Sequence, residues 1–523
     1  MSKKSKTPSF VVERRLLIDD FQYDWLQRKM DICNKIYNTA AKYFTVIIAE
    51  MRDTDTYKQT QAAIEQAKKE KDNIKREKLL SSLYNNIYKL MTEFCITEYN
   101  IQKFMNVQRK NAFNECVGSP IVQKIATQLY NSIFKSIKNN TKVHFRKYGQ
   151  TCSFEGKSNN ASIIYHEKHV NCSYANASPD TVKIMGEVFQ LKPIRQNDVY
   201  MQQVAQNMKV KYCRVVRKPF KSKYRYFLQL IVEGTPPEKL KTGNGYCGID
   251  EGTSTVAYYN DAESDFIFLA DGVEKYNKQI IRFNRMYERR LQLANPDCYN
   301  YDGTLKKGAK LKVRTKGSKK ALMSLKNAYR LKSVFVKQQH NRLVNRLIES
   351  ANVFVKEPMN FKALQKKSKK TKGKRSTTPS IIKTKSGKEK RIFKCKRQKR
   401  FGKSLNNKSP GYFNAQLIRR AKQYNCAIID VDINLYKASQ YNHITQIPTK
   451  VGLNDRTKII GTHLVQRDLY SSFLLYCMDT TSAIDFELCS NKFGDFLYKQ
   501  DVVIRKIKVT GDKTHTFGIN QFV

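Results

Sequence analysis

The sequence predicts a multidomain α+β protein, in which a small β-rich domain carries an inserted helical bundle and an α/β domain follows. Three observations predict this architecture. Phe10–Ile18 is an extended run rich in β-branched residues, which favours a strand. Apolar residues then recur at helical spacing over 23–138, with no Gly or Pro before Gly118. Beyond about residue 243, short apolar runs alternate with long helical patterns.

The first strand is expected to combine with four later ones in a small, wedge-like β-barrel. The candidate strands are 162–165, 188–191, 210–217 and 224–232. The last two are expected to form a hairpin, because their alternating patterns flank a short basic turn. We therefore assign residues 1–20 and 143–243 to the barrel, and residues 21–142 to the inserted helical recognition bundle. Turn residues at 234–237 and 241–245 mark the boundary to the next domain.

The α/β domain, residues 244–479, begins with three predicted strands separated by short turns. These strands are 246–250, 255–259 and 265–269. Helical patterns at 273–293 and 322–350 then precede a fourth strand at 352–355 and a fifth at 426–431. Three strands followed by helix, strand, helix, strand and helix is the element order of a ribonuclease-H-like domain. The sequence suggests no role for the C-terminal extension, residues 480–523.

The charge of the chain is its most unusual property. Lys and Arg total 97 against 45 Asp and Glu, which gives a formal net charge of +52. Such an excess repels itself in a compact state, so a polyanionic partner is expected, and nucleic acid is the natural one. Residues 306–337 contain 12 basic and no acidic residues, and the insertion 362–400 contains 18 basic residues and one acidic. The alternative for this insertion is a solvated segment that only aids solubility.

We expect the insertion to be a loop that becomes ordered on nucleic acid. The predicted nucleic-acid contacts are Arg467, Lys366, Lys367, Lys369, Lys370, Lys372, Lys374 and Arg375. The 12 cysteines are scattered without a CxxC pair, as is typical of reduced thiols. No apolar run of about 18 residues occurs, and no apolar segment follows the charged N-terminus, so neither a membrane span nor a signal peptide is expected. These features predict a cytoplasmic, nucleoid-associated prokaryotic protein without a membrane partner.

Three acidic residues stand out by their positions. Asp250 closes the first strand of the α/β domain, Glu357 follows the fourth strand, and Asp468 lies in a stretch with helical spacing. Carboxylates at the ends of neighbouring strands and on an adjacent helix converge, and they repel one another unless cations neutralise them. Oxygen ligands suit Mg²⁺ or Mn²⁺, and two such ions about 4 Å apart can hydrolyse a phosphodiester.

The expected roles follow from this chemistry. Asp250 would bridge two ions, Glu357 would hold the ion that activates water, and Asp468 would complete the other site. Each acid also has a simpler interpretation: a strand-end Asp is usually a turn or cap residue, and Asp468 could pair with Arg467. The other carboxylates near the first strand are expected to lie on the surface. They are Glu251, Asp261, Glu263 and Asp265.

The three acidic motifs resemble those of TnpB, the transposon-encoded RNA-guided nuclease, and of the related compact type V CRISPR effectors. Gly248-Ile249-Asp250 followed by Gly252 resembles the first RuvC motif of that family. The segments 355–364 and 466–474 resemble the second and third, and Ser439-Gln440 resembles the pair that precedes the third. The resemblance implies an RNA-guided DNA endonuclease with a RuvC-like nuclease domain. It further implies that guide RNA and target DNA are the partners, held by the barrel and the bundle.

One departure from the family concerns zinc. The family carries two CxxC pairs before the third motif, whereas residues 441–465 contain no cysteine, and His443 and His463 alone do not make a four-ligand site. We therefore expect no structural zinc. The competing interpretations are a catalytically weak RNA-guided DNA-binding protein, an unguided transposase-like enzyme, and a basic structural RNA-binding protein. The sequence does not distinguish a transposon guide from a CRISPR guide, and it does not give the oligomeric state.

Overall fold

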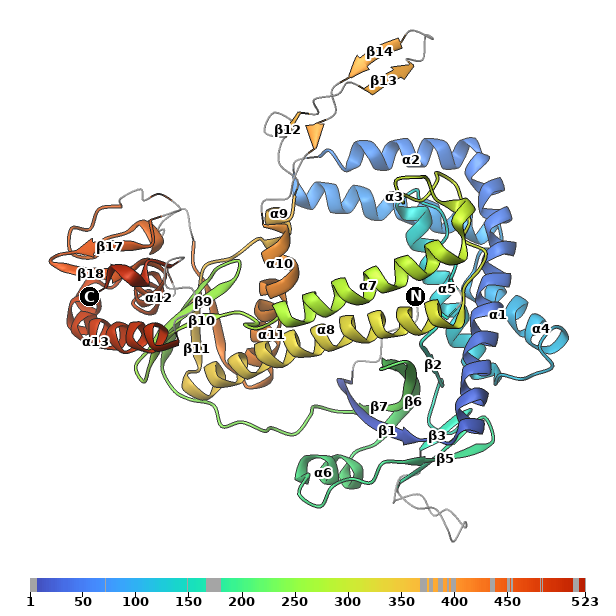
Figure 1. Ribbon diagram of the computed structural model, residues 1–523, viewed down its shortest axis with the longest axis horizontal. Coiled ribbons are helices and arrows are strands. Elements are labelled where there is room, and N and C mark those ends of the chain that lie inside the picture. Colours follow the sequence, from blue (N-terminus) through green and yellow to red (C-terminus); the bar gives the residue numbers. More distant parts are fainter. Residues whose placement is uncertain are drawn as a thin grey trace. The chain divides into compact units, whose positions relative to one another are not determined.

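The computed structural model in Figure 1 describes most of the chain. The described residues are 7–70, 72–147, 149–165, 180–366, 374–375, 380–383, 389–392, 395–396, 401–432, 438–448, 452, 455–479, 481, 483–510 and 517–522. They form two compact units, Met1–Pro237 and Glu238–Val523. No described helix combines the length and the apolar character that a membrane span requires.

The first unit contains one seven-stranded sheet in the order β2-β6-β7-β1-β5-β4-β3. Its strands are β1 (Ser9–Leu17), β2 (Ser153–Glu155), β3 (Ile163–Tyr165), β4 (Thr181–Ile184), β5 (Glu187–Leu191), β6 (Val210–Phe220) and β7 (Lys223–Glu233). The predicted hairpin is present as β6 and β7, and Lys221 adopts a φ of 51° in its turn. The predicted barrel is not closed in the described residues, because the end strands β2 and β3 do not pair with each other. Closure depends on strand tilt and stagger, which the sequence pattern does not specify.

The predicted helical bundle lies between β1 and β2 in the chain. Its helices are α1 (Asp20–Asp53), α2 (Asp55–Ala67), α3 (Asn73–Glu93), α4 (Glu98–Asn111) and α5 (Ser119–Lys138), and a short α6 (Val199–Asn207) precedes β6. Asp19 caps α1 by accepting a hydrogen bond from Gln22 N at 2.7 Å. The periodic apolar residues of α1, including Leu26, Met30 and Ile36, are buried in the core of this unit.

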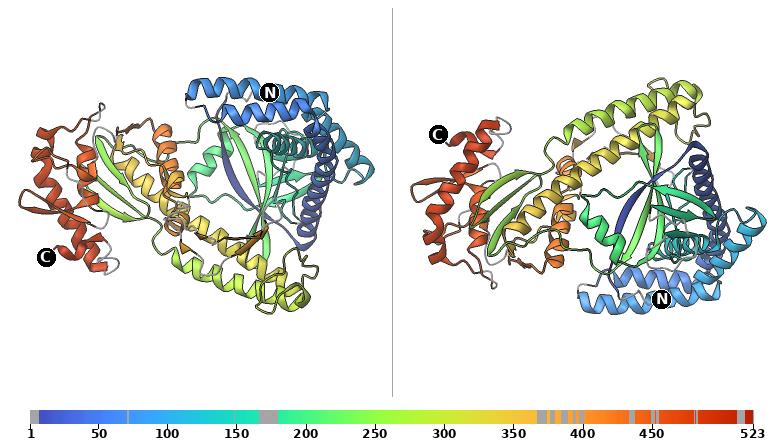
Figure 2. Two further views of the ribbon diagram at one scale, coloured as in Figure 1. Left: turned by 90° about the horizontal axis from the view of Figure 1, so that it is seen from above. Right: turned by 90° about the horizontal axis from the view of Figure 1, so that it is seen from below.

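The second unit is built on a five-stranded mixed sheet in the order β10-β9-β8-β11-β16. The strands are β8 (Tyr246–Glu251), β9 (Thr255–Asn260), β10 (Ser264–Phe268), β11 (Val353–Lys356) and β16 (Ala427–Asp430). The first three are antiparallel, and β11 is parallel to both β8 and β16. Helices α8 (Lys316–Ser350) and α11 (Pro410–Gln423) cover one face, while α12 (Arg467–Tyr476) and α13 (Phe486–Thr510) cover the other (Figure 2). The element order predicted from the sequence is therefore present.

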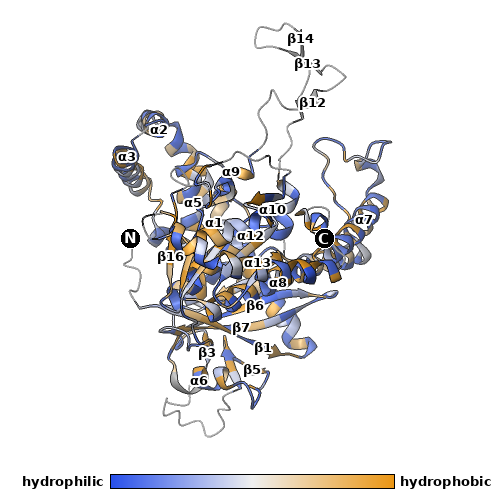
Figure 3. Cartoon of the chain, turned by 90° about the vertical axis from the view of Figure 1, so that its left-hand side faces the viewer, coloured by the Kyte–Doolittle hydropathy of each residue, from blue (hydrophilic) through white to orange (hydrophobic). Residues whose placement is uncertain are grey.

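The remaining elements surround this sheet. Helix α7 (Glu274–Ala294) lies along the first part of α8, and much of α7 is coloured hydrophilic in Figure 3. Short helices α9 (Phe361–Leu364) and α10 (Gly402–Lys408) flank the basic insertion, whose described pieces are β12 (Lys374–Arg375), β13 (Ser380–Lys383), β14 (Glu389–Ile392) and β15 (Cys395–Lys396). A hairpin of β17 (Thr457–Ile460) and β18 (His463–Gln466) leads into α12.

The C-terminal extension is part of the core of the second unit. Along α13 the buried side chains include Phe496, Val503 and Ile504, and the Phe496 ring stacks on Phe473 of α12 with centroids 4.8 Å apart. Ile519, in a 3-10 turn (Ile519–Gln521), is completely buried in the same cluster. The face of the sheet that carries α12 is thus completed by residues beyond 480.

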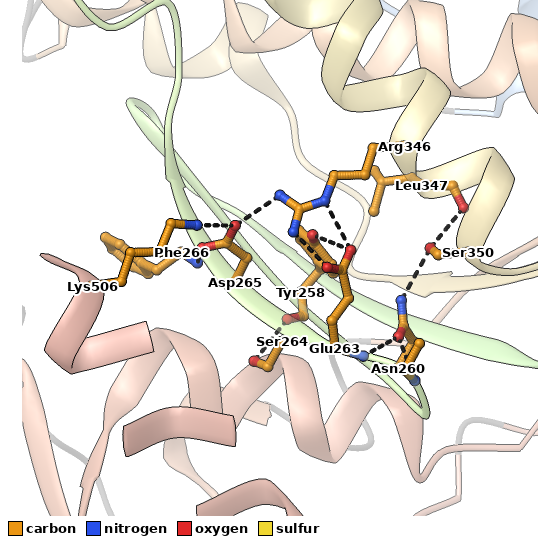
Figure 4. A network of polar contacts seen from close by, with 11 residues as sticks. Tyr258, Asn260, Glu263, Ser264, Asp265, Phe266, Arg346, Leu347, Ser350 and Lys506 are labelled. Carbon is orange, nitrogen blue, oxygen red and sulfur yellow. Dashed lines mark hydrogen bonds and ion pairs between the residues drawn. The ribbon is translucent and has the colours of Figure 1, made fainter. Parts of the chain in front are cut away.

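Charged residues tie the β9–β10 hairpin to helices on both faces of the sheet (Figure 4). Arg346 of α8 donates to Asp265 at 2.8 Å and to Glu263 at 2.9 and 2.5 Å. Lys506 of α13 donates to the same Asp265 carboxylate at 3.0 Å. The expectation that Asp265 lies on the surface is wrong, since it is 2% exposed. Its burial is tolerated because two cations, brought from distant parts of the chain, compensate its charge.

Candidate active site

Strand β8 positions Asp250 against helix α12. Alternation along the strand sends Cys247 and Ile249 into the core under α8, so Gly248 and Asp250 face α12. A Cβ on Gly248 would lie 2.0 Å from Ser472 O and 2.3 Å from Tyr476 N. Only glycine permits this approach, and the close contact is what brings the first turn of α12 next to the end of β8.

Glu357 and Asp468 reach the same place from different elements. Glu357 directly follows β11, which is parallel to β8 and pairs Lys356 with Ile249, so its position lies beside Asp250. Asp468 is in the first turn of α12. The start of this helix is fixed by Gln466, whose side chain accepts from Leu469 N at 2.8 Å. All three predicted catalytic acids line one pocket of about 340 Å³.

The pocket has a mixed lining. Beside the three acids it contains Glu251, Gly252, Thr253, Ser254, Thr255, Met359, Leu364, Phe401, Gln440, Arg456, Arg467 and Phe517. Gln440 belongs to the Ser-Gln pair singled out in the sequence. Phe517 comes from the C-terminal extension, which the sequence did not connect to the site. The only signal for Phe517 in the sequence is an aromatic residue that follows a long helical pattern. The neighbouring residues do not indicate where that segment packs.

The acids influence one another electrostatically. The pKa of Asp250 is raised well above its usual range, first by burial and then by the negative charges of Asp468 and Glu357, while Arg467 opposes the shift. Burial also raises the pKa of Glu357, and the backbone of Ala438 opposes this. Negative charge is therefore unfavourable in this pocket unless a cation compensates it.

Two arginines already lie against Asp468. Arg467 is 3.3 Å from Asp468 Oδ1, and Arg456 Nη1 is 3.7 Å from Oδ2. In the described part of the chain, no three or more carboxylate, His or Cys side chains are arranged so that they could hold a metal ion. The donor chemistry nevertheless fits a hard cation, because the polar acceptors that line the pocket are carboxylate, hydroxyl and amide oxygens.

Glu251 is a further acid that the sequence placed wrongly on the surface. It is 3% exposed, lines the pocket, and has no hydrogen-bond partner for either carboxylate oxygen among the described residues. Burial raises its pKa to about 7, and the nearby Lys356 opposes this shift. Lys356 is itself buried and pairs with Asp430 at 2.8 Å. The alternation of β8, which puts Glu251 on the same side as Ile249, was the available signal.

The predicted nucleic-acid contacts fall into four groups. Arg467 donates to Gly452 O at 3.2 Å and Asp455 O at 2.9 Å in addition to Asp468, so its guanidinium is held in the pocket wall. Lys366 follows α9 and is exposed. The backbone of Lys374 and Arg375 forms β12, but their side chains lie outside the described ones. Four predicted contacts lie outside the described residues: Lys367, Lys369, Lys370 and Lys372.

The predicted zinc-free interval contains a buried histidine. His443 is 4% exposed, its Nδ1 lies 2.7 Å from the Tyr470 hydroxyl, and its ring is 4.7 Å from that of Phe493. Burial lowers its pKa. His443 is thus a packing residue of the core under α12, and His463 lies in β18, with its ring 6.0 Å from that of Phe493.

A basic groove of about 470 Å³ runs along α7, away from the acidic pocket. Its lining residues are Lys278, Ile281, Arg282, Arg285, Met286, Arg289 and Arg290. Four of the five cations, Lys278, Arg282, Arg285 and Arg289, recur every three to four residues, which places them on one face of the helix, and Arg290 adjoins Arg289. No acidic residue contributes to the lining. This groove was not predicted from the sequence, although α7 itself was.

Comparison with known proteins gives only distant matches. No family model matches the chain, and no curated protein matches it. Among solved structures, a complex of Cas12f1 with sgRNA and target DNA matches with a TM-score of 0.43 and 11% identity, over 90% of this chain and 99% of that one. A CRISPR-Cas12f ternary complex matches with a TM-score of 0.24 and 13% identity, over 87% and 84%. A Cas12i1 R-loop complex matches with a TM-score of 0.24 and 8% identity, over 80% and 58%. With TM-scores below 0.5, none of these matches decides the fold or the function of this chain.

Proposed function

We propose that this protein is an RNA-guided DNA endonuclease with a metal-dependent, RuvC-type active site built from Asp250, Glu357 and Asp468. The observation that carries the proposal is that these three acids, in β8, directly after β11 and in α12, line one pocket. A mixed sheet of order β10-β9-β8-β11-β16 with helices on both faces is typical of ribonuclease-H-like nucleases, and it supports this assignment.

The metal-dependent part of the proposal follows from the charge of the pocket. Asp250, Glu357 and Asp468 would hold Mg²⁺ or Mn²⁺, in two sites, through carboxylate oxygens. When bound, the ions supply an activated water and neutralise charge on the phosphodiester. The raised pKa of Asp250 means that its ionisation and cation binding favour each other. Arg456 and Arg467 add positive charge at the same pocket, which attracts the phosphate of a nucleic-acid strand.

The partners we propose are guide RNA and target DNA. A net charge of +52 and a groove lined by five cations on α7 favour a long polyanion over a small substrate. The three acidic motifs resemble those of enzymes in which base pairing with a guide supplies sequence specificity.

The first experiment is to purify the protein from its native locus and sequence the copurifying RNA. We expect one abundant species with a constant scaffold and a variable end. Reconstituted with that RNA, the protein should cut DNA that matches the variable end, and only in the presence of Mg²⁺ or Mn²⁺. Asp250→Asn should abolish cleavage while guide and target binding persist. Asp261→Asn is the matched control, because Asp261 lies in the β9–β10 turn and pairs with Lys492.

The alternatives predict different outcomes of the same experiment. Target binding with no cleavage by the wild-type protein would indicate a catalytically weak RNA-guided DNA-binding protein. DNA cleavage by protein that carries heterogeneous RNA or none would indicate an unguided, transposase-like enzyme. Loss of RNA binding in Asp250→Asn would assign Asp250 a role in folding rather than catalysis.

A further inference from the structure

The C-terminal residues reach the candidate active site through one arginine. Beyond α13 the described chain resumes at Phe517, whose ring lies 5.2 Å from the rings of Phe266 and of Phe268 in β10. Lys508 Nζ donates to Phe522 O at 2.5 Å, which fastens the end of the turn to α13. The segment Phe517–Phe522, here called the C-terminal turn, is thus anchored at both ends.

The C-terminal turn lies directly on Arg456 and Thr457. Gly518 has a φ of +72°, and a Cβ at this position would lie 2.9 Å from Arg456 Cβ and 3.1 Å from Thr457 Cγ2. The side chains of Thr457 and Gln521 are hydrogen-bonded to each other. Glycine is needed at 518 for two reasons, the left-handed backbone and the lack of space beside Arg456.

Arg456 is held between the C-terminal turn and a catalytic acid. Its guanidinium lies over the Phe517 ring, 5.5 Å from the centroid, and its Nη1 is 3.7 Å from Asp468 Oδ2. Arg456 O also accepts from Arg467 N at 2.9 Å, just before Asp468. Arg456, Phe517 and Asp468 all line the acidic pocket.

We propose that the C-terminal turn is a working part of the active site, and that it holds Arg456 as a positioning residue for Asp468. The inference rests on the proposed nuclease function, because it assigns Asp468 to metal binding. Phe517 and Gly518 fix the conformation of the Arg456 side chain. Arg456 in turn fixes the orientation of the Asp468 carboxylate. The extension beyond residue 480 therefore both completes the core and orients a catalytic group.

The test uses the full chain and three pairs of variants. Arg456→Ala and Phe517→Ala remove the two contacting groups, and Arg456→Lys and Phe517→Tyr restore charge and ring. Arg456 is partly exposed, so its replacement leaves the core intact. A third test variant is Gly518→Ala. Its control is Gly308→Ala, which places alanine at another glycine of positive φ (+83°) but with no atom within 4 Å of the added Cβ.

Two readouts are required for every variant. The first is single-turnover cleavage at saturating guide and target; we expect Arg456→Ala, Phe517→Ala and Gly518→Ala to lose about 10- to 100-fold, as a catalytic group displaced by about 1 Å would. The second is Mn²⁺ affinity of the nucleic-acid-free protein, measured by electron paramagnetic resonance, which should change in the same three variants. The Lys and Tyr variants should recover both properties in part, and Gly308→Ala should match the wild type in both.

The Mn²⁺ titration separates the failure of this inference from the failure of the proposed function. A wild-type protein that binds Mn²⁺ but does not cut DNA would overturn the nuclease assignment, and the variants would still report on Asp468. Wild-type cleavage and wild-type Mn²⁺ affinity in Arg456→Ala and Phe517→Ala would overturn the positioning role. Equal losses in the conservative and the alanine variants would reduce the C-terminal turn to a folding element.

Discussion

Gly248→Ala tests whether the contact between β8 and α12 builds the candidate active site. The added Cβ would lie 2.0 Å from Ser472 O and 2.3 Å from Tyr476 N, where ordinary contacts begin at 3.4 Å. These are backbone atoms of α12, so the helix must move by about 1.4 Å relative to the strand. Overpacking of this kind costs about 1–3 kcal/mol. Because Asp468 is one turn away on the same helix, we also expect about a 100-fold loss of cleavage.

The assay must resolve one region of a two-unit protein. The single tryptophan, Trp25, lies in the first unit, so its fluorescence does not report on this site. Hydrogen exchange of α12 peptides measures the local effect, and single-turnover cleavage measures the catalytic one. Gly494→Ala is the matched control, because Gly494 lies in α13 and no atom lies within 4 Å of a Cβ added there. Alanine at this helical position should raise the stability of the protein by up to about 1 kcal/mol. Unchanged exchange and cleavage in Gly248→Ala would refute the close packing of α12 on β8.

Three further predictions concern stability and binding. His340 is buried and burial lowers its pKa, so the folded state disfavours its protonation. The second unit should therefore lose stability as the pH falls below about 6.5. His340→Gln should weaken this pH dependence of the melting temperature, measured by calorimetry. Arg346→Met leaves the acids in Figure 4 without their α8 partner and should destabilise by about 1–3 kcal/mol, seen as faster exchange in β10, whereas Arg342→Met on the same helix should not. Replacing Arg282 and Arg289 by Gln should weaken RNA binding and flatten its salt dependence without lowering the melting temperature; an unchanged salt slope would remove α7 from the interface.

The sequence predicted the central sheet of the second unit because its strands are short, apolar and separated by clear helical patterns. The runs that became β8, β11 and β16 end at charged residues, and such ends marked Asp250 and Glu357 directly. The motif on α12 marked Asp468. What brought these acids to one pocket, the absence of a side chain at Gly248, could be explained only once Ser472 and its neighbours were seen against the strand.

The features that the sequence did not reveal depend on distant contacts. Glu251 and Asp265 resemble surface acids in their local sequence, yet both are buried. Asp265 is bonded by Arg346 and Lys506, which are 81 and 241 residues away. The same limit applies to α13 and the C-terminal turn, since an amphipathic pattern predicts a helix but does not say which surface it covers. For the unclosed barrel, alternation predicted the strands but not their tilt.

Helix α8 has a mechanical consequence. Its 35 residues extend about 52 Å, with the last turns packed under the sheet and the first turns paired with α7 (Figure 1). It ends at Ser350, three residues before β11, the strand that leads to Glu357. A rod of this length acts as a lever: a tilt of about 5° at the sheet moves the far end by roughly 5 Å. A force on α7 and the first turns of α8 would therefore reach β11, the strand before Glu357, as a small rotation of the C-terminal end of α8.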